Sequence, residues 1–300
     1  MKKAVLTGGT GFLGYWLLQE LVARGVFVYV IQRRNSLRKE RLNGIENIRI
    51  IELDMNEIQH LPDKIDDSCD VFYHLAWEGG RNDFYGQTKN ICDTVNAVQA
   101  AKEIECKRII LTGSQAEYGL HTDRVTEDTP TEPNTAYGAS KLAACHLTRI
   151  LAEQLKIEWT WVRIFSLYGP YDNPNTLISY LLRELLASRS PTVTRADQIW
   201  DYLHVYDAAK AICILGESEK TNTVYNLANG RNAPLKEFIN KIVNTVDTSI
   251  TINYGGFKPE MPIVSLNASV DKITTDTVWR PSIDFSEGVN DLLRHLEEGY

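Results

Sequence analysis

The chain has 300 residues, of which 43% are hydrophobic and 24% are charged, and its formal net charge is −7. This composition is ordinary for a globular protein and leaves room for one large domain or two moderate ones. The net negative charge argues against binding to nucleic acid, and no apolar stretch is long enough to span a bilayer. We therefore expect neither a nucleic-acid nor a membrane partner.

Apolar runs rich in β-branched and aromatic residues alternate with segments of helical periodicity. The runs predict strands at residues 3–6, 26–32, 48–53, 71–76, 108–112, 159–165 and 224–227. The periodic segments predict helices at residues 12–24, 85–103, 137–154, 177–187, 235–246 and 285–295. Alternation of this kind predicts an α/β fold, with a parallel sheet covered by helices on both faces.

The alternation of predicted strands and helices becomes less regular after residue 165, where the chain contains Pro170, Pro174 and Pro191. The sequence contains no internal repeat and no low-complexity linker. We therefore expect two interleaved parts rather than two tethered domains. The first spans residues 1–165 plus about 205–228, and the second, smaller part spans 166–204 and 229–300.

The cysteines and histidines show no pattern of a metal site. The five cysteines are scattered and form no CxxC pair, and the six histidines show no metal-ligand spacing. This pattern indicates reduced thiols in a cytoplasm, and no metal is expected.

A glycine-rich turn, TGGTGFLG at 7–14, follows the first predicted strand and opens the first predicted helix. Gly8, Gly11 and Gly14 permit a tight turn and let backbone amides approach a pyrophosphate. The helix N-terminus that follows favours negative charge. A turn without a ligand is the alternative, but this position between strand and helix favours dinucleotide binding.

The second predicted strand ends in Gln32-Arg33-Arg34, where NAD-preferring enzymes usually carry an acid for the ribose 2′-hydroxyl. Because a guanidinium group at Arg33 or Arg34 suits a 2′-phosphate, the sequence predicts NADP, with NAD as the alternative. A solvated basic turn competes with this interpretation, since more basic residues follow nearby. Asp54 closes the third strand and either contacts the adenine or caps the next turn.

Acid–base chemistry beside the dinucleotide is predicted by three residues that lie further along the chain. Ser114 ends a predicted strand, at the sheet edge where ligands of open parallel sheets bind. Tyr137 and Lys141 are one helical turn apart and share a face. We expect the lysine ammonium to lower the pKa of the tyrosine, so that it exchanges a proton with a substrate oxygen held by Ser114. A tyrosine and a lysine at this spacing also occur by chance on surface helices.

These residues carry a family resemblance that spans nearly the whole chain. The chain resembles the extended short-chain dehydrogenase/reductases, in particular their NAD(P)-dependent nucleotide-sugar epimerase, dehydratase and reductase group. The matching pieces are TGGTGFLG (7–14), Asp54-Met55, FYHLAW (72–77), GSQAEYG (113–119), YGASK (137–141), VRIFSLYGP (162–170), WDYLHVYD (200–207) and Trp279-Arg280-Pro281.

The resemblance implies a Rossmann-type doubly wound domain and a smaller C-terminal domain that holds a nucleoside-diphosphate sugar. It also implies a homodimer, formed in relatives through the helices at 85–103 and 137–154. The residues expected at the cofactor are Gly8, Thr10, Gly11, Phe12, Leu13, Gly14, Arg33, Arg34, Asp54, Met55, Leu75, Ala76, Tyr137, Lys141 and Ile164.

The positions where this chain departs from the group's pattern limit the reactions that we expect it to catalyse. Sugar 4,6-dehydratases of the group carry an acid in the pair after the serine, where this chain has Gln115-Ala116, with Glu117 one place too late. Elimination needs that second acid–base pair, so a dehydratase is disfavoured. Ser166 and Trp200 replace the usual asparagine and arginine of the sugar-nucleotide site. The candidate diphosphate partners that remain are Arg163, Arg183, Arg195 and Arg280.

We therefore predict an enzyme that uses NADPH to reduce a nucleotide-linked 4-keto-6-deoxy sugar, with Ser114, Tyr137 and Lys141 as its catalytic residues. A nucleotide-sugar 4-epimerase with tightly held NAD is the first alternative. The second alternative, from another class, is a regulatory protein that binds NADP and catalyses nothing. The intact catalytic set argues against it.

Overall fold

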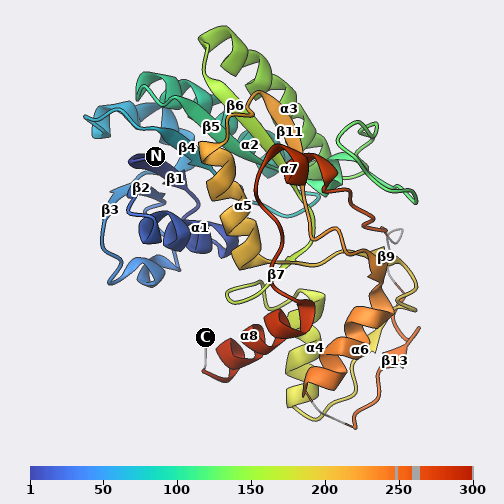
Figure 1. Ribbon diagram of the computed structural model, residues 1–300. Coiled ribbons are helices and arrows are strands. Elements are labelled where there is room, and N and C mark those ends of the chain that lie inside the picture. Colours follow the sequence, from blue (N-terminus) through green and yellow to red (C-terminus); the bar gives the residue numbers. More distant parts are fainter. Residues whose placement is uncertain (247–248, 259–263, 299–300) are drawn as a thin grey trace.

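The computed structural model describes residues 1–246, 249–258 and 264–298. Its centre is a seven-stranded parallel sheet in the order β11-β6-β5-β4-β1-β2-β3 (Figure 1). The strands are β1 (Lys3–Thr7), β2 (Phe27–Gln32), β3 (Ile48–Glu52), β4 (Val71–His74), β5 (Arg108–Ser114), β6 (Glu158–Ile164) and β11 (Thr223–Leu227). The chain begins at the centre, runs outward to β3 and returns to β4 on the other side of β1. This confirms the expected doubly wound, Rossmann-type fold.

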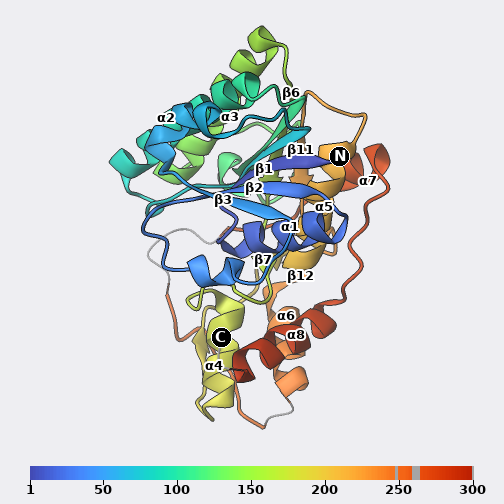
Figure 2. The same cartoon turned by 90° about the vertical axis from the view of Figure 1, so that its left-hand side faces the viewer.

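Helices cover both faces of this sheet, and each layer closes its own apolar core (Figure 2). The helices are α1 (Phe12–Ala23) and α5 (Val205–Glu217) on one face and α2 (Phe84–Glu103) and α3 (Ala136–Leu155) on the other. Along β1, Ala4 and Leu6 pack into the first core and Val5 into the second. This alternation is what a strand buried on both faces requires.

Helix α5 lies at residues 205–217, where the sequence patterns above predict no helix. Its buried residues lie on most of its surface, from Val205 through Ala209 and Ile212 to Gly216. This burial on several sides follows from the position of α5 between the sheet and α1.

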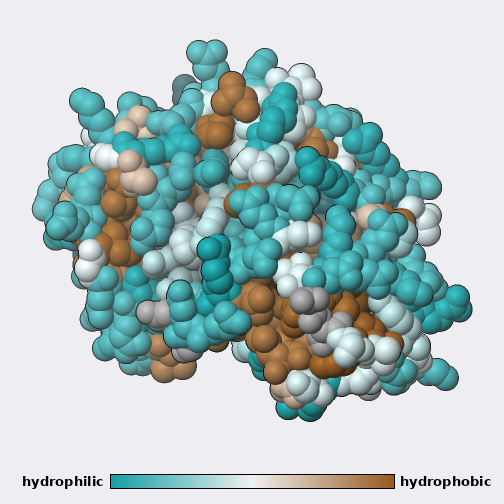
Figure 3. Space-filling view, turned by 60° about the horizontal axis from the view of Figure 1, so that its bottom comes forward, coloured by the Kyte–Doolittle hydropathy of each residue, from teal (hydrophilic) through white to brown (hydrophobic). Residues whose placement is uncertain are grey.

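A smaller part of the molecule holds α4 (Leu177–Leu186), α6 (Leu235–Val246) and α8 (Phe285–Glu297). It also contains short strand pairs, which are β7 (Leu167–Tyr168) with β10 (Leu203–His204), β9 (Ile199–Trp200) with β12 (Ala233–Pro234), and β8 (Thr192–Val193) with β13 (Asn253–Tyr254). The three helices share a separate core around Tyr202, Phe238 and Phe285. Figure 3 shows apolar residues gathered on the outside of this part.

One late segment packs differently from the expected division of the chain. Helix α7 (Asp271–Asp276) lies against β11, and Ile273 and Trp279 belong to the core beside α5. The Trp279 indole donates to the carbonyl of Asp207 at 2.9 Å. We therefore propose that this segment belongs to the nucleotide-binding part, and that the other boundaries stand as expected.

The described helices include none that is both long and apolar enough to cross a membrane. All five cysteines are free, and only Cys92 is exposed.

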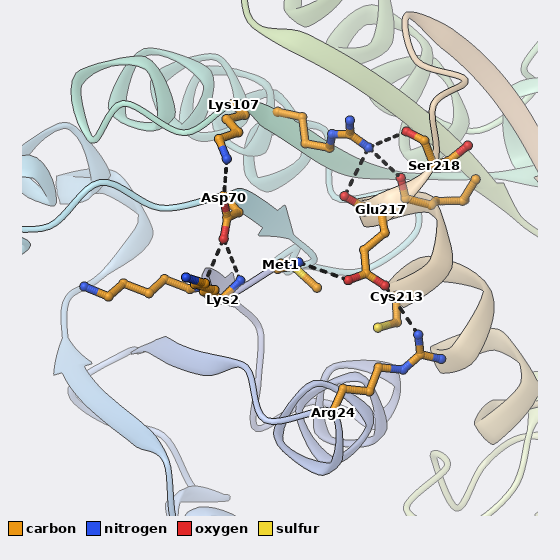
Figure 4. A network of polar contacts seen from close by, with 12 residues as sticks. Met1, Lys2, Arg24, Asp70, Lys107, Cys213, Glu217 and Ser218 are labelled. Atoms are coloured by element: carbon orange, nitrogen blue, oxygen red, sulfur yellow. Dashed lines mark hydrogen bonds and ion pairs between the residues drawn. The ribbon is translucent and has the colours of Figure 1, made fainter.

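Asp70 joins three strands at the edge of the sheet where β1, β4 and β5 begin (Figure 4). Its carboxylate accepts hydrogen bonds from the backbone N–H groups of Lys2 at 2.6 Å and Lys3 at 3.2 Å, and from Lys107 Nζ at 2.7 Å. Burial alone would raise the pKa of Asp70, but these hydrogen bonds outweigh it and lower the pKa to about 2. The ionised carboxylate therefore stabilises the folded state.

We expect Asp70→Asn to lower the free energy of unfolding at pH 7 by about 1 kcal/mol, a value reduced for solvent screening of a partly exposed group. The folded pKa lies below the unfolded value of about 3.9, so this contribution is present above that pH. It is lost as the pH falls from about 4 to about 2. Denaturant titrations at pH 7 and 2.5 measure it, with the exposed Asp66→Asn as control. An equal difference at both pH values would contradict the assignment.

Candidate active site

The glycine turn joins β1 to α1 at the carboxyl edge of the sheet. Gly8 has a φ of +76°, and its carbonyl accepts the Gly11 N–H at 2.9 Å. A Cβ on Gly14 would collide with the Gly8 carbonyl, and a Cβ on Gly8 would press on the backbone of Leu75 and Ala76. Helix α1 starts at Gly11 without a side-chain cap, so its first amides form an anion-binding cradle.

A first cavity of about 300 Å³ lies beside this turn. Its lining residues include Gly8, Thr10, Gly11, Gln32, Arg33, Ser36, Arg38, Leu53, Met55, Leu75, Ala76, Trp77 and Glu78. The amide oxygen of Gln32 is buried and has no hydrogen-bond partner among the described residues. A ribose hydroxyl would supply that missing partner. The glycine cradle and this orphaned oxygen fit the adenosine half of a dinucleotide.

The arginines after β2 take different positions. Arg33 lines the first cavity and pairs with Glu78 at 3.3 Å. Arg34 turns away and is held by Asp54 at 3.0 Å and by Glu57 at 2.7 Å. Neither Arg34 nor Asp54 lines the first cavity or the second one described below, and Asp54 makes no side-chain cap of the turn that follows it. Its carboxylate instead binds the Arg34 guanidinium.

Arg38 is a residue that the sequence interpretation did not select. It lines both the first cavity and a second one of about 400 Å³. Within the described part of the chain it makes no ion pair, unlike Arg33 and Arg34. Only its place beside the glycine turn distinguishes it, and that place depends on the folded loop.

The second cavity continues from the glycine turn to the predicted catalytic residues. Its lining residues include Phe12, Leu13, Gly14, Leu75, Trp77, Thr112, Ser114, Tyr137, Lys141, Ile164 and Phe165. All residues expected at the cofactor, except Arg34 and Asp54, therefore line the first or the second cavity. Both cavities share Gly8, Gly11 and Leu75, so together they form a trough for one extended ligand.

Lys141 is buried at the floor of the second cavity. Its Nζ donates to the Thr112 carbonyl at 2.7 Å and lies 3.6 Å from the ring centroid of Trp77, a cation–π contact. Burial lowers the pKa of Lys141 to about 7, against the opposing effect of Glu117. The ammonium is therefore close to its titration midpoint at neutral pH.

Tyr137 lies beside Lys141 and Ser114, but its pKa differs from the expectation. Burial raises the pKa of the phenol, while the hydrogen bond with Ser114 lowers it and the charge of Glu117 raises it. The expected lowering by Lys141 is thus wrong for this structure, because the ammonium lies 5.9 Å from the Tyr137 ring centroid and against Trp77 instead. Tyr137 holds its proton at neutral pH.

A third cavity of about 320 Å³ opens on the other side of Ser114 and Tyr137. It is lined by Arg81, Ser114, Gln115, Tyr137, Ile164, Phe165, Ser166, Leu167, Trp200, Val264 and Leu266. Among the described residues it has one cation, Arg81, and no carboxylate.

The loop after β4 presents Trp77 and Arg81 to the cavities, and α2 holds that loop in place. The Gln87 side chain accepts from the Trp77 indole at 2.8 Å and donates to the Gly80 carbonyl at 3.0 Å. The Tyr137 N–H donates to the Arg81 carbonyl at 2.9 Å. We identified neither Trp77 nor Arg81 as a site residue from the sequence, and their position after the fourth strand was the available signal.

Glu117 and Arg163 are buried beneath Ser114, where the Arg163 Nε lies 2.8 Å from the carboxylate. Arg163 is therefore no free partner for a diphosphate. The other candidates are engaged as well, since Arg195 pairs with Asp197, and Arg183 and Arg280 donate to backbone carbonyls. Within the described residues no cluster of His, Cys, Asp or Glu could hold a metal ion.

A family model described as the NAD dependent epimerase/dehydratase family matches residues 4–228. The chain belongs to this family. The match includes the glycine turn, Ser114, Tyr137 and Lys141, so the trough and the predicted catalytic residues lie within the matched region.

Curated relatives cover nearly the whole chain at low identity. The chain is 25% identical to the CDP-abequose synthase of Salmonella typhimurium over 97% of both proteins. It is 23% identical to the protein CapI of Staphylococcus aureus over 99% of both.

Solved structures share the fold over the full length. The UDP-N-acetylglucosamine 4-epimerase of Methanobrevibacter ruminantium, in complex with UDP-N-acetylmuramic acid, matches with a TM-score of 0.89 at 23% identity, over 100% of this chain and 99% of that one. The UDP-glucuronic acid 4-epimerase of Bacillus cereus, in complex with NAD, matches with a TM-score of 0.86 at 23% identity over the whole of both chains.

Proposed function

We propose that this protein reduces a nucleotide-linked 4-keto-6-deoxy sugar with NADPH. The observation that carries the proposal is the end of β2, where the first cavity meets Gln32, Arg33, Ser36 and Arg38 and no acidic residue of that strand. Such a set favours a 2′-phosphate over a free 2′-hydroxyl. NADPH, the cofactor with a 2′-phosphate, is consumed in a net reduction such as the proposed one.

The residues of the site support the following roles. When bound, the reduced dinucleotide supplies the hydride. Ser114 and Tyr137 line both the second and the third cavity, so their hydroxyls flank a sugar oxygen placed between the two. Because burial raises the pKa of Tyr137, the phenol keeps its proton and donates it to the developing alkoxide. Lys141 lines the same second cavity, where its ammonium adds positive charge beside the cofactor.

The substrate part of the proposal rests on the third cavity and on the relatives. Arg81 and the polar side chains of Gln115 and Ser166 face a wall of Phe165 and Leu266, which suits a sugar with one apolar substituent. The names of the relatives include CDP- and UDP-linked sugars, which supports a nucleoside-diphosphate sugar here.

A cofactor assay tests the function directly. The purified protein is mixed with NADPH and a panel of 4-keto sugar nucleotides, and the absorbance of the reduced cofactor is followed. Stoichiometric consumption with formation of the 4-hydroxy sugar is expected. Interconversion of 4-epimers without net consumption would replace the proposal by the epimerase. Tight cofactor binding without turnover of any sugar would favour the regulatory protein.

The epimerase is the second candidate, and the structural neighbours favour it. Several are 4-epimerases, and some of these are complexes with NAD. The same Ser114, Tyr137 and Lys141 would serve it, with the hydride returned to the opposite face of the sugar. The two candidates therefore differ in cofactor and net redox change rather than in catalytic residues.

Cofactor choice gives a separate prediction. We expect Arg33→Ala/Arg38→Ala to weaken NADP binding relative to NAD by about 100-fold, since a hydrogen bond to a charged group contributes about 1.5–3 kcal/mol. Dissociation constants from the quenching of protein fluorescence measure the ratio.

Arg34→Ala is the matched control, because Arg34 is bound to Asp54 and Glu57 and lines neither cavity. We expect it to leave the ratio unchanged. If instead the control shifted the ratio and the double variant did not, the 2′-phosphate would lie at Arg34.

We further propose a homodimer through the outer faces of α2 and α3. The exposed apolar residues there include Tyr85, Leu147 and Ile150, which lie on the side away from the sheet. Apolar residues clustered on neighbouring helices support a contact with a second copy.

A further inference from the structure

The carboxylate of Glu117 is fully buried directly beneath the catalytic serine. It accepts the Ser114 N–H at 2.8 Å, the Trp161 indole N–H at 3.0 Å and the Arg163 Nε at 2.8 Å. A buried carboxylate with this many donors is an organised site, since each unsatisfied oxygen would cost the desolvation of a charge.

These contacts hold the backbone that carries the Ser114 hydroxyl. Ser114 caps the short 3-10 helix η4 (Gln115–Glu117), and its side chain accepts the Ala116 N–H at 3.2 Å while Glu117 accepts the Ser114 N–H in return. A Cβ on Gly113 would collide with both Trp161 and Glu117. The backbone of Ser114 is therefore held both by its own cap of η4 and by the carboxylate of Glu117, which is charged.

The charges around the site explain why a carboxylate stands here. The Lys141 Nζ donates to the carbonyl of Thr112, and the Glu117 carboxylate packs against the next residue, Gly113. The charge of Glu117 raises the pKa of Lys141 against the effect of burial, and burial and Lys141 lower the pKa of the buried His74 to about 3. Glu117 is thus the carboxylate beside the ammonium within the described residues. The other titratable groups that face the carboxylate or the phenol are Arg163, Tyr118, Cys145 and Arg81.

We propose that Glu117 is a positioning residue that holds Ser114 against Tyr137 and serves as the buried counter-charge of Lys141, with Arg163 as its clamp. The inference rests on the proposed function only in that Tyr137 exchanges the proton. It predicts that loss of the negative charge changes the protonation of the site without emptying the cofactor trough, because Glu117 lines none of the cavities.

Glu117→Gln keeps the side-chain shape and one acceptor oxygen but removes the charge. The pKa of Tyr137, which Glu117 raises, is expected to fall, and the pKa of Lys141, already lowered to about 7, is expected to fall further. A shift of about one unit is expected for each. Turnover is then expected to decrease at a lower pH than in the wild type, because the lysine in the second cavity loses its positive charge at a lower pH.

The first readout does not depend on activity. The absorbance of ionised phenol is titrated with pH in the wild type and in Tyr137→Phe, and the difference isolates one tyrosine. The same pair is measured in the Glu117→Gln background. A Tyr137 titration displaced to lower pH supports the counter-charge, and an unchanged titration overturns it. If the proposed reductase activity is absent, this result still decides the inference.

The second readout is the pH profile of kcat with the strongest substrate of the panel. Glu117→Gln is expected to lower kcat about tenfold or more at pH 8 with an unchanged KM for the cofactor, and to move the profile to lower pH. Trp161→Phe removes the two hydrogen bonds of the indole N–H to the carboxylate but keeps the charge, and is expected to leave the profile in place. A profile that moves equally in both variants would show a merely structural role.

If Glu117→Gln fails to fold, the cause would be the buried Arg163 guanidinium, which has lost its ion-pair partner. Glu117→Gln/Arg163→Gln removes both charges and restores local neutrality. It is expected to move the Tyr137 titration in the same direction as the single variant, by less. No displacement in a folded double variant would overturn the proposal.

Discussion

Tyr137→Phe is expected to lower turnover by about 10³-fold, the largest effect of any single substitution in this site. The phenol is the proposed proton donor and lines both the second and the third cavity, and no other acidic side chain lines the third cavity among the described residues. The Phe side chain keeps the ring contact with Trp77, which has a centroid distance of 6.2 Å. Cofactor affinity should therefore change little. NADPH consumption at saturating substrate measures the loss, and fluorescence titration measures the affinity.

Tyr85→Phe is the matched control, since Tyr85 is 93% exposed on α2 and lies outside the cavities. It should retain wild-type turnover. Turnover within threefold of the wild type in Tyr137→Phe would exclude the phenol as the proton donor. Ser114 would then be the hydroxyl to examine next, because it lines the same two cavities.

Gly14→Ala is expected to destabilise the fold by about 3 kcal/mol and to abolish dinucleotide binding. The new methyl group would collide with the Gly8 carbonyl, a rigid backbone atom of the same turn. Relief of that collision must move the start of α1 away from β1, and this opens the cradle that both cavities share. Thermal unfolding with and without NADPH measures both effects, since a bound ligand raises the Tm of the wild type.

Gly80→Ala is the control for an added methyl group near the trough. Gly80 lies in the loop after β4, and a Cβ there would meet no atom within 4 Å. Its stability and its NADPH-induced rise in Tm should match those of the wild type. A Gly14→Ala variant that keeps the full rise would contradict the close approach of α1 to the turn.

Much of the fold could be predicted because its signals are local. Strand runs and helical periods come from neighbouring residues, and all seven strands of the central sheet were predicted to within two residues at either end. The helices α5 and α7 were not predicted: α5 follows directly on the two-residue strand β10, and α7 has only six residues. The segment around Trp279 was expected in the smaller part, and we propose the nucleotide-binding part instead, because its contact with Asp207 joins residues far apart in the chain.

The sequence by itself determined which groups meet at the site. Glycine spacing at 8, 11 and 14, the serine at the end of a strand, and Tyr137 one turn before Lys141 are consequences of short-range geometry, and parallel strands bring their carboxyl ends to one edge. Only the tertiary structure decided the charge state and the binding partners of those groups. It set the direction of the Tyr137 pKa, separated Arg34 from Arg33 and Arg38, and placed Glu117 under Ser114. Charge state and ion pairing depend on burial and on partners from remote segments, and neither can be read from spacing along the chain.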